Sequence, residues 1–162
     1  MKISKRRRTE GKTDYKARMD LLKSEKPRIV FRKTNRYIIS QYVISDEAQD
    51  KIILQANSKE LLKYGWPEKF KSVKNTSASY LTGFLLGKKM QKEKLDTPII
   101  DFGMLRVLHK TKLFAFIKGL NDAGVETKCD AKNFPEEEKI FGKKLKNKIP
   151  FKEIKDKLEK IN

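Results

Sequence analysis

Three runs of apolar residues in the first third of the chain alternate with polar positions in the way that strands do. The first run is Arg-Ile-Val-Phe-Arg-Lys after Pro27, and the others cover residues 37–44 and 51–56. The turn formers Thr-Asn-Arg separate the first two runs. β-Branched and aromatic residues bounded by turn formers predict a three-strand antiparallel meander.

Successive side chains of a strand point to opposite faces, so this meander has two different sides. One side is expected to be dry and is formed by Ile38, Ser40, Tyr42 and Ile44 of the second strand and Ile52, Leu54 and Ala56 of the third. The other side and the first turn carry Arg, Lys, Asn, Tyr and Gln side chains. Such a side suits a polyanion that also offers bases and hydroxyl groups.

Two short helices are predicted, one before and one after the meander. Tyr15, Met19 and Leu22 recur at helical spacing and predict a helix that ends near Ser24, with Thr13 as its N-cap. Residues 2–12 are too polar to bury themselves, and we expect an extended arm there. After the meander, residues 58–64 predict a helical turn that Gly65 would close.

A longer helix is predicted from Asn75 or Thr76 to about Lys92. Ser79, Gly83 and Gly87 are four residues apart and form a smooth stripe along it. Such a stripe favours close packing of another backbone and is not by itself a functional signal.

The second half of the chain adds one strand and two helices. Residues 98–103 form a continuous apolar run, which predicts an interior strand. Residues 112–122 predict a strong helix with Gly124 as its C′ residue. After Pro150, a weaker helical stripe predicts a terminal helix that is docked or bound to a partner; its members are Phe151, Ile154, Leu158 and Ile161.

These elements predict an α/β fold with two layers. Its mostly antiparallel sheet has the three-strand meander plus one further strand, and helices cover one face. We expect a basic extended arm at residues 1–12, a globular domain at residues 13–126 and a charged tail at residues 127–162.

Charge changes the interpretation of the exposed face. The chain of 162 residues has a formal net charge of +18, and residues 1–36 contribute +10 of it with 14 basic and 4 acidic residues. This excess costs stability through self-repulsion unless a partner neutralises it. The Lys-Arg-Arg-Arg run at residues 5–8 lacks the Trp, Phe and Leu partners of a membrane-surface helix. The basic arm therefore favours RNA over lipid.

Several other classes of protein have little support. No apolar run approaches the roughly 20 residues that span a bilayer, and no secretory signal is visible, which favours a cytosolic protein. Cys129 is the only cysteine and excludes an internal disulfide.

Catalysis also lacks the residues it needs. His109 is the only histidine, no second carboxylate cluster accompanies Asp101, and no glycine-rich phosphate loop is present. We expect no catalytic residues, no metal site, no cofactor and no small-molecule substrate.

The first turn of the meander concentrates side chains that recognise RNA. Arg32, Lys33, Asn35, Arg36 and Tyr37 fall within six residues. Tyrosine can stack on a base, arginine can stack or bind phosphate, and asparagine can hydrogen-bond base edges or a 2′-hydroxyl. The alternative is a solvated hairpin tip in which Asn35 supplies a positive φ.

Six stretches then resemble, in order, a known family. They are RRRTEGKTDY (6–15), LLKSEKPRIVFRKTNRYIISQ (21–41), YGW (64–66), NTSASYLTG (75–83), IIDFG (99–103) and NDAG (121–124). The chain resembles the archaeal and eukaryotic branch of the large-subunit ribosomal protein family L-eighteen, which binds 5S ribosomal RNA. The eukaryotic long insertions are missing, so the archaeal type fits better.

The resemblance implies a structural role without enzymatic activity. It implies binding to 5S rRNA, attachment of that RNA to the large-subunit rRNA at the central protuberance, and neighbouring ribosomal proteins as partners in the cytoplasm. The RNA contacts that it implies are Arg6, Arg7, Arg8, Lys12, Thr13, Tyr15, Arg28, Arg32, Lys33, Asn35, Arg36, Tyr37 and Gln41. Residues after 126 depart from the family's pattern.

Two functions of other classes stay open on the residues alone. One is a metal-dependent RNA-processing enzyme that uses Asp101 and Mg²⁺. The other is a basic adaptor for acidic proteins that docks through the stripe at residues 151–161.

Overall fold

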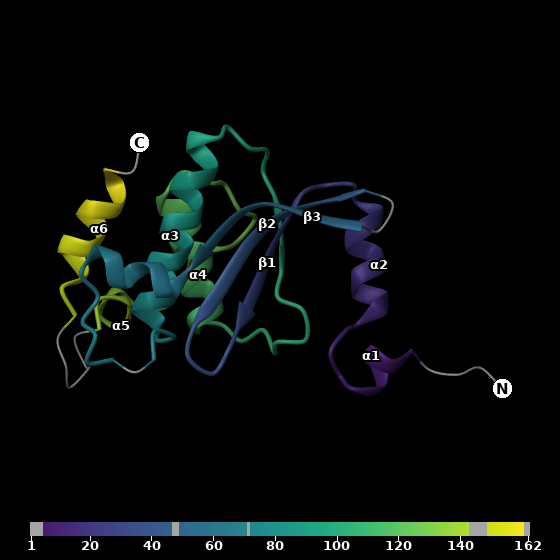
Figure 1. The fold of residues 1–162 in the computed structure, drawn as a ribbon, viewed down its shortest axis with the longest axis horizontal. Helices are drawn as coiled ribbons and strands as arrows, with labels where there is room; N and C mark the ends of the chain where they lie inside the picture. The colour runs from purple at the N-terminus through teal and green to yellow at the C-terminus, as the bar shows by residue number, and fades with distance from the viewer. Residues whose placement is uncertain (1–4, 47–48, 71, 143–148, 161–162) are drawn as a thin grey trace.

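A four-stranded sheet with strand order β3-β2-β1-β4 lies at the centre of the computed structural model, which describes residues 5–46, 49–70, 72–142 and 149–160 (Figure 1). β1 (Arg28–Lys33), β2 (Ile38–Asp46) and β3 (Gln49–Asn57) pair antiparallel, and β4 (Ile99–Asp101) pairs with β1 in parallel. The predicted α/β fold, with its meander and one further strand, is confirmed.

β4 lies at an edge of the sheet, so the prediction of an interior strand is wrong. Its apolar composition has another cause, because Ile100 and Phe102 pack against the core from this edge. The Phe102 ring lies edge-on to Phe31 of β1 at a centroid distance of 5.7 Å.

A β-bulge at Ile53 interrupts the alternation of the sheet. Tyr42 pairs with Leu54 but Val43 pairs with Ile52, so Ile53 has no partner across the ladder. An extra residue reverses the faces beyond it. Beyond the bulge, Ile44 of β2 and Ile52 of β3 are 44% and 52% exposed, although both belong to the side predicted to be dry, whereas Val43 of the opposite side is buried.

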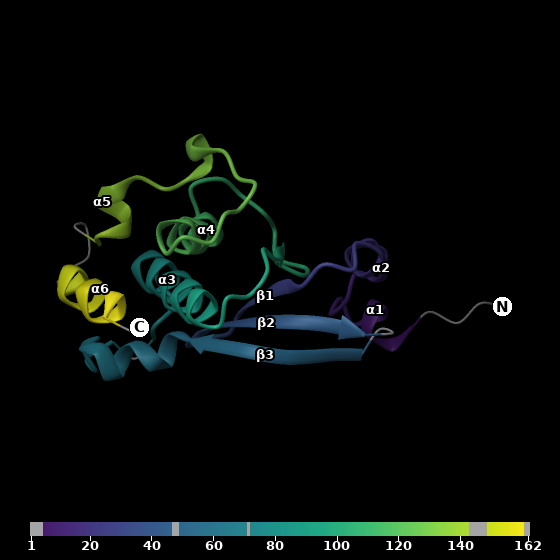
Figure 2. The ribbon, with the colours of Figure 1, turned by 90° about the horizontal axis from the view of Figure 1, so that it is seen from above.

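Two long helices, α3 (Thr76–Lys92) and α4 (Lys112–Asp122), run side by side and cover one side of the strands (Figure 2). The Asn75 Oδ1 accepts a hydrogen bond from the backbone N–H of Ala78 at 2.7 Å and caps α3 as predicted. The helices approach closely because Gly83 faces the backbone carbonyl of Phe116, and Gly119 of α4 faces that of Tyr80. The packing role predicted for the small-residue stripe is confirmed.

The N-terminal segment differs from its prediction. Arg6–Thr9 form one turn of helix, α1, where an extended arm is predicted. α2 (Tyr15–Lys23) is capped by Asp14, whose carboxylate accepts from two backbone N–H groups, and not by Thr13. The predicted end of this helix at Ser24 is confirmed.

A 3-10 helix, η1 (Ser58–Tyr64), follows the meander where a helical turn is predicted. Asn57 and Glu60 form a capping box at its start, and Gly65, with a φ of 103°, closes it as expected. Ser58 is buried; its hydroxyl accepts from the N–H of Ile38 and donates to the carbonyl of Val73. This hydroxyl ties the start of β2 to the segment before α3.

Three short elements end the chain: η2 (Ala131–Asn133), α5 (Glu137–Ile140) and α6 (Phe151–Glu159). α6 occupies the segment for which a terminal helix is predicted, and it packs on α3 and η1. Phe151, Ile154 and Leu158 are buried there, so the stripe proposed as the surface of an adaptor is used within the molecule; Ile161 lies outside the described residues. None of the described helices is long and apolar enough to cross a membrane.

Candidate nucleic-acid interface

The turn between β1 and β2 is closed by Thr34. The hydroxyl of Thr34 donates to the carbonyl of Tyr37 and accepts from its N–H, both at 2.9 Å, and the Thr34 N–H donates to the same carbonyl. Asn35 is not among the residues with positive φ, so the expectation that it supplies such a conformation is wrong. Within the described part of the chain, the exposed side chains of Asn35 and Arg36 have no hydrogen-bond partner.

The turn is also anchored to the body of the molecule from behind. The carbonyl of Arg36 accepts from the N–H of Val73 at 2.8 Å, and Tyr37 forms a parallel bridge with Val73. Tyr37 itself is half-buried and packs partly against the core. The backbone of the turn is therefore fixed while the side chains at its tip remain available.

The side of the sheet opposite the helices carries an arginine held in a defined orientation. The guanidinium of Arg32 donates to the Asp101 carboxylate at 3.1 Å and to its carbonyl at 3.0 Å. Gly103 lies against this guanidinium with a φ of 60°, and its N–H donates to the other carboxylate oxygen of Asp101 at 2.6 Å. Arg32 still keeps 44% of its side chain exposed. An orientated, exposed guanidinium plane can bind a phosphate or stack on a base.

This use of Asp101 bears on the metal-dependent alternative. Both of its carboxylate oxygens are already engaged, one by Arg32 and the other by Gly103. Among the described residues, no group of three or more His, Cys, Asp or Glu side chains could hold a metal ion.

Two glutamines extend the polar side of the sheet. Gln41 of β2 donates from Nε2 to Oε1 of Gln55 on β3 at 3.1 Å, across a directly paired register. The sequence placed Gln55 on the polar side of the sheet but only Gln41 among the predicted contact residues. The signal that could have found Gln55 is cross-strand pairing, which needs the position of the bulge before the register can be assigned.

Arg28 occupies a different environment from the other predicted contact residues, because it is 1% exposed. Its Nη2 donates to Asp50 at 2.7 Å and to Ser45 at 2.8 Å, and its Nη1 lies 3.6 Å from Asp101. Burial alone would raise the pKa of Asp50. Hydrogen bonds from Arg18 and Ser45 and the charge of Arg28 outweigh this effect and lower the pKa below its usual value. In this conformation Arg28 offers no surface to a ligand.

The basic segment before α2 is organised around one acidic residue. Glu10 accepts hydrogen bonds from Lys12 at 2.6 Å and from Arg6 at 2.7 Å. These two bonds, from Lys12 first and then Arg6, lower the pKa of Glu10. All three side chains lie at the surface, so such pairs contribute little stability and can exchange partners readily.

Three further predicted contacts, Arg7, Thr13 and Tyr15, have partners within this segment. Arg7 donates to the hydroxyl of Thr13 at 2.9 Å, and the Lys5 ammonium lies 4.5 Å from the centre of the Tyr15 ring. Arg8 is exposed.

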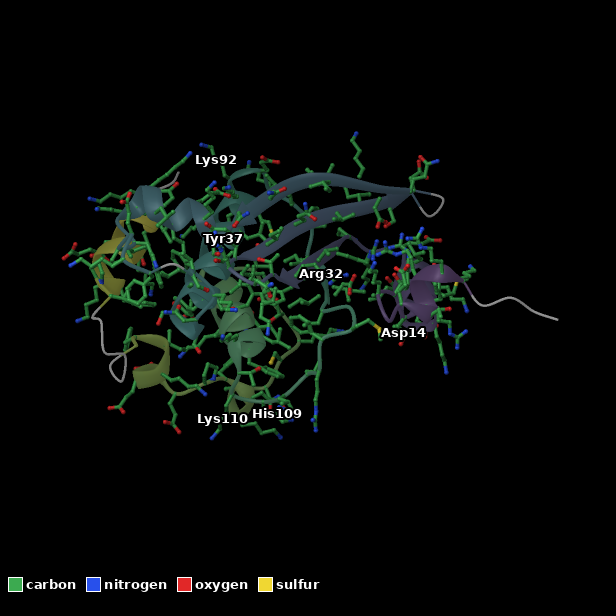
Figure 3. The ribbon with its side chains drawn as sticks, turned by 60° about the horizontal axis from the view of Figure 1, so that its bottom comes forward. Asp14, Arg32, Tyr37, Lys92, His109 and Lys110 are labelled. Atoms are coloured by element: carbon green, nitrogen blue, oxygen red, sulfur yellow. The ribbon has the colours of Figure 1, made fainter. Side chains whose placement is uncertain are left out.

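The predicted contact residues fall into two groups that the fold keeps apart. α1 and α2 lie at the end of the sheet where β1 begins, whereas the turn follows the end of β1 (Figure 1). Six residues of strand span about 20 Å. In Figure 3, Asp14 at the start of α2 and Tyr37 at the turn lie on opposite sides of Arg32. An extended polyanion, rather than a small ligand, could contact both groups.

Residues 1–98 match the family of ribosomal large subunit proteins described as 60S L5 and 50S L18. Similar curated proteins include the large ribosomal subunit protein uL18 of Korarchaeum cryptofilum, 43% identical over 89% of this chain and 72% of its own length. The chain belongs to the uL18 family. The uL18 protein of Methanoregula boonei is 39% identical over 88% of this chain and 80% of its own length. That of Methanothermobacter thermautotrophicus is 37% identical over 89% of this chain and 73% of its own length.

Membership of the uL18 family confirms the resemblance found in the sequence, including its archaeal type. Proteins of this family are structural components of the large subunit of the cytoplasmic ribosome and not enzymes. The predicted non-enzymatic role and location are therefore confirmed, and the RNA-processing alternative loses its basis.

Proposed function

We propose that this member of the uL18 family binds 5S rRNA and helps to attach it to the large-subunit rRNA at the central protuberance. The family assigns a structural role in the large subunit, with ribosomal RNA and other ribosomal proteins as partners. The proposal adds that the RNA bound is 5S rRNA, and it assigns the residues that contact it.

The observation that carries the proposal is the turn between β1 and β2, whose backbone is fixed while the exposed side chains at its tip have no hydrogen-bond partner among the described residues. Thr34 closes the turn, so the exposed Asn35 amide and Arg36 guanidinium are not needed for its geometry. A fixed backbone lowers the entropy lost when these side chains are ordered against an RNA. An amide can read base edges or a 2′-hydroxyl, whereas a guanidinium can bind phosphate or stack.

The other predicted contacts have distinct roles in this proposal. Arg32 and Gln41 extend the surface along the sheet, and Tyr37 offers the accessible part of its ring. Lys33 and the N-terminal group contribute phosphate contacts, with Arg6 and Lys12 exchanging Glu10 for the RNA backbone. Arg28 supports the sheet from within, through Asp50.

Binding of the full chain to 5S rRNA, measured by filter binding against an unrelated folded RNA of the same length, tests the proposal. We expect 5S rRNA to bind at least about 10-fold more tightly, since specific readout adds to the shared phosphate contribution. The affinity for both RNAs should fall with salt, with a slope on the order of −0.7 to −0.9 per phosphate contact. Equal affinity for the two RNAs would refute the proposed function.

Variants at the tip of the turn distinguish recognition of bases from electrostatic attraction to phosphate. Asn35→Ala should reduce the preference for 5S rRNA with little change in salt slope. Arg36→Gln should weaken binding to both RNAs and lower the slope by about 1. Lys152→Ala, which removes an exposed charge from α6 far from the turn, is the control and should leave the preference unchanged.

A further inference from the structure

A hollow of about 420 Å³ lies beside the turn, where the end of β1, the start of α3, the loop after β4 and the start of α4 meet. Its floor is apolar and is formed by Phe31, Leu105 and Leu113. Its polar lining consists of Lys33, Thr76, Arg106, Thr111, Lys112 and Lys139. Four cations and two hydroxyl groups thus surround one cavity, and no carboxylate is among its described lining residues.

The described part of the protein supplies no counter-charge for these cations. Among the described residues, no carboxylate lies within ion-pair distance of Lys33, Arg106 or Lys112. Lys139 donates to the carbonyl of Lys110, at 3.2 Å. Burial, together with the charges of Lys33 and Lys74, lowers the pKa of Lys112. Like charges held together without a counter-charge destabilise the fold until an anion binds.

The start of α4 adds to this positive potential. Thr111 donates its hydroxyl to the carbonyl of Leu108 at 2.7 Å and does not cap the helix. The first turn of this 11-residue helix, with Lys112 and Leu113, lines the hollow. The partial positive charge of an uncapped helix start therefore acts together with the side-chain cations.

We propose that the hollow binds a backbone phosphate of the RNA and forms a phosphate anchor separate from the reading surface at the tip of the turn. This inference rests on the proposed function. The described lining residues offer ammonium, guanidinium and hydroxyl donors but no side-chain carboxylate or amide to pair with a base. A site of this kind recognises phosphate independently of sequence.

The position of the hollow next to the turn favours RNA as the source of the phosphate. Lys33 lines the hollow and precedes by two residues the Asn35 of the turn, so one RNA strand that contacts the turn passes the hollow. The loop that carries Arg106 also exposes His109 and Lys110 at the edge of the molecule (Figure 3).

Substitutions in the hollow, tested in the full chain, provide one arm of the experiment. Lys112→Gln and Arg106→Gln should each weaken binding to 5S rRNA and to the unrelated RNA about 5- to 30-fold, and each should lower the salt slope by about 1. The matched control is Lys118→Gln on the same helix but outside the hollow. It should change neither affinity nor slope.

Inorganic phosphate, added to the free protein at constant ionic strength, provides the second arm. It should raise the unfolding midpoint of the wild type and of Lys118→Gln relative to chloride, because binding to the native state alone stabilises it. The shift should be lost in Lys112→Gln. Circular dichroism of each variant confirms that the fold is retained.

The two proposals fail in different ways. If the wild type binds both RNAs equally, the proposed function is refuted, yet hollow variants should still weaken both complexes. Wild-type RNA affinity and salt slope in Lys112→Gln and Arg106→Gln would overturn the phosphate anchor. A phosphate shift that is equal in all variants would overturn it as well.

Discussion

At the scale of single residues, the same side chain has opposite roles in different places. Arg28 and Arg36 are eight positions apart, yet one is buried against Asp50 and the other is exposed at the tip of the turn. Composition alone suggests RNA contact for both. The difference arises from β3, which brings Asp50 to Arg28 and which the local sequence of β1 cannot reveal.

The Arg28–Asp50 pair predicts how stability depends on pH. The folded pKa of Asp50 lies below its usual value of 3.8, so its contribution is fully present above that value and is lost as pH falls through the folded pKa. Asp50→Asn should destabilise the protein by about 1–3 kcal/mol at neutral pH, since a buried guanidinium loses a partner. Urea unfolding from pH 7 downward should show the difference from wild type shrinking only below about pH 4. Glu10→Gln, at a surface pair with exposed basic partners, is the control. A difference between Asp50→Asn and wild type that is independent of pH would contradict the prediction.

A second prediction at this scale concerns Gly119. A methyl group there would meet the backbone of Tyr80 and Phe84 on α3, which cannot yield as a flexible side chain can. Gly119→Ala should therefore lower the free energy of unfolding by about 1–3 kcal/mol despite its better helix propensity. Lys118→Ala, one position away and with only a 3.8 Å pair to an exposed glutamate, should stay within about 0.5 kcal/mol of wild type in the same urea titration. If the free energy of unfolding of Gly119→Ala equals that of the wild type, α3 and α4 can move apart without a loss of stability.

At the scale of elements, local sequence patterns predicted the features that depend on a few neighbouring residues. Alternation identified the meander, and Asn75 and Gly65 marked helix ends, because these signals act over a few residues. The bulge at Ile53 could not be predicted, since an extra residue leaves the composition of the strand unchanged. The edge position of β4 depends on tertiary pairing in the same way.

The limits at the candidate site have the same origin. The turn and its candidate contact residues could be predicted together because they are contiguous in sequence. The hollow gathers Lys33, Arg106, Lys112 and Lys139 from four separate segments, and only the packing of α4 against the sheet brings them together. Of these residues the sequence indicated only Lys33 as an RNA contact, because it adjoins the turn.

The terminal helix supports a prediction at this scale. Ile154 is fully buried where α6 packs on α3 and η1. Ile154→Ala should cost about 2–5 kcal/mol and make α6 exchange its amide hydrogens faster, whereas Lys152→Ala on its exposed face should do neither. Hydrogen exchange and urea unfolding measure the two effects. RNA affinity should stay at the wild-type value, because the turn lies away from α6 (Figure 1); a large loss would place α6 in the interface.

At the scale of the whole molecule, the net charge of +18 creates a tension between folding and binding. Ion pairs such as Arg28–Asp50 stabilise the native state locally. The surplus cations at α1, at the turn and in the hollow repel one another over longer distances. Screening by salt weakens exposed, long-range repulsion more than it weakens a buried pair.

Salt should therefore move stability and RNA affinity in opposite directions. Raising sodium chloride from about 20 to about 200 mM shortens the screening length from about 20 Å to below 10 Å. The unfolding midpoint of the free protein should rise over this range because self-repulsion decreases, while affinity for RNA falls through the loss of counterion release. Lys112→Gln removes one of the repelling cations, so its midpoint should start higher and rise less steeply than that of Lys118→Gln. A midpoint that falls with salt would mean that attractive pairs dominate the native state, and the excess charge would then need an explanation other than neutralisation by RNA.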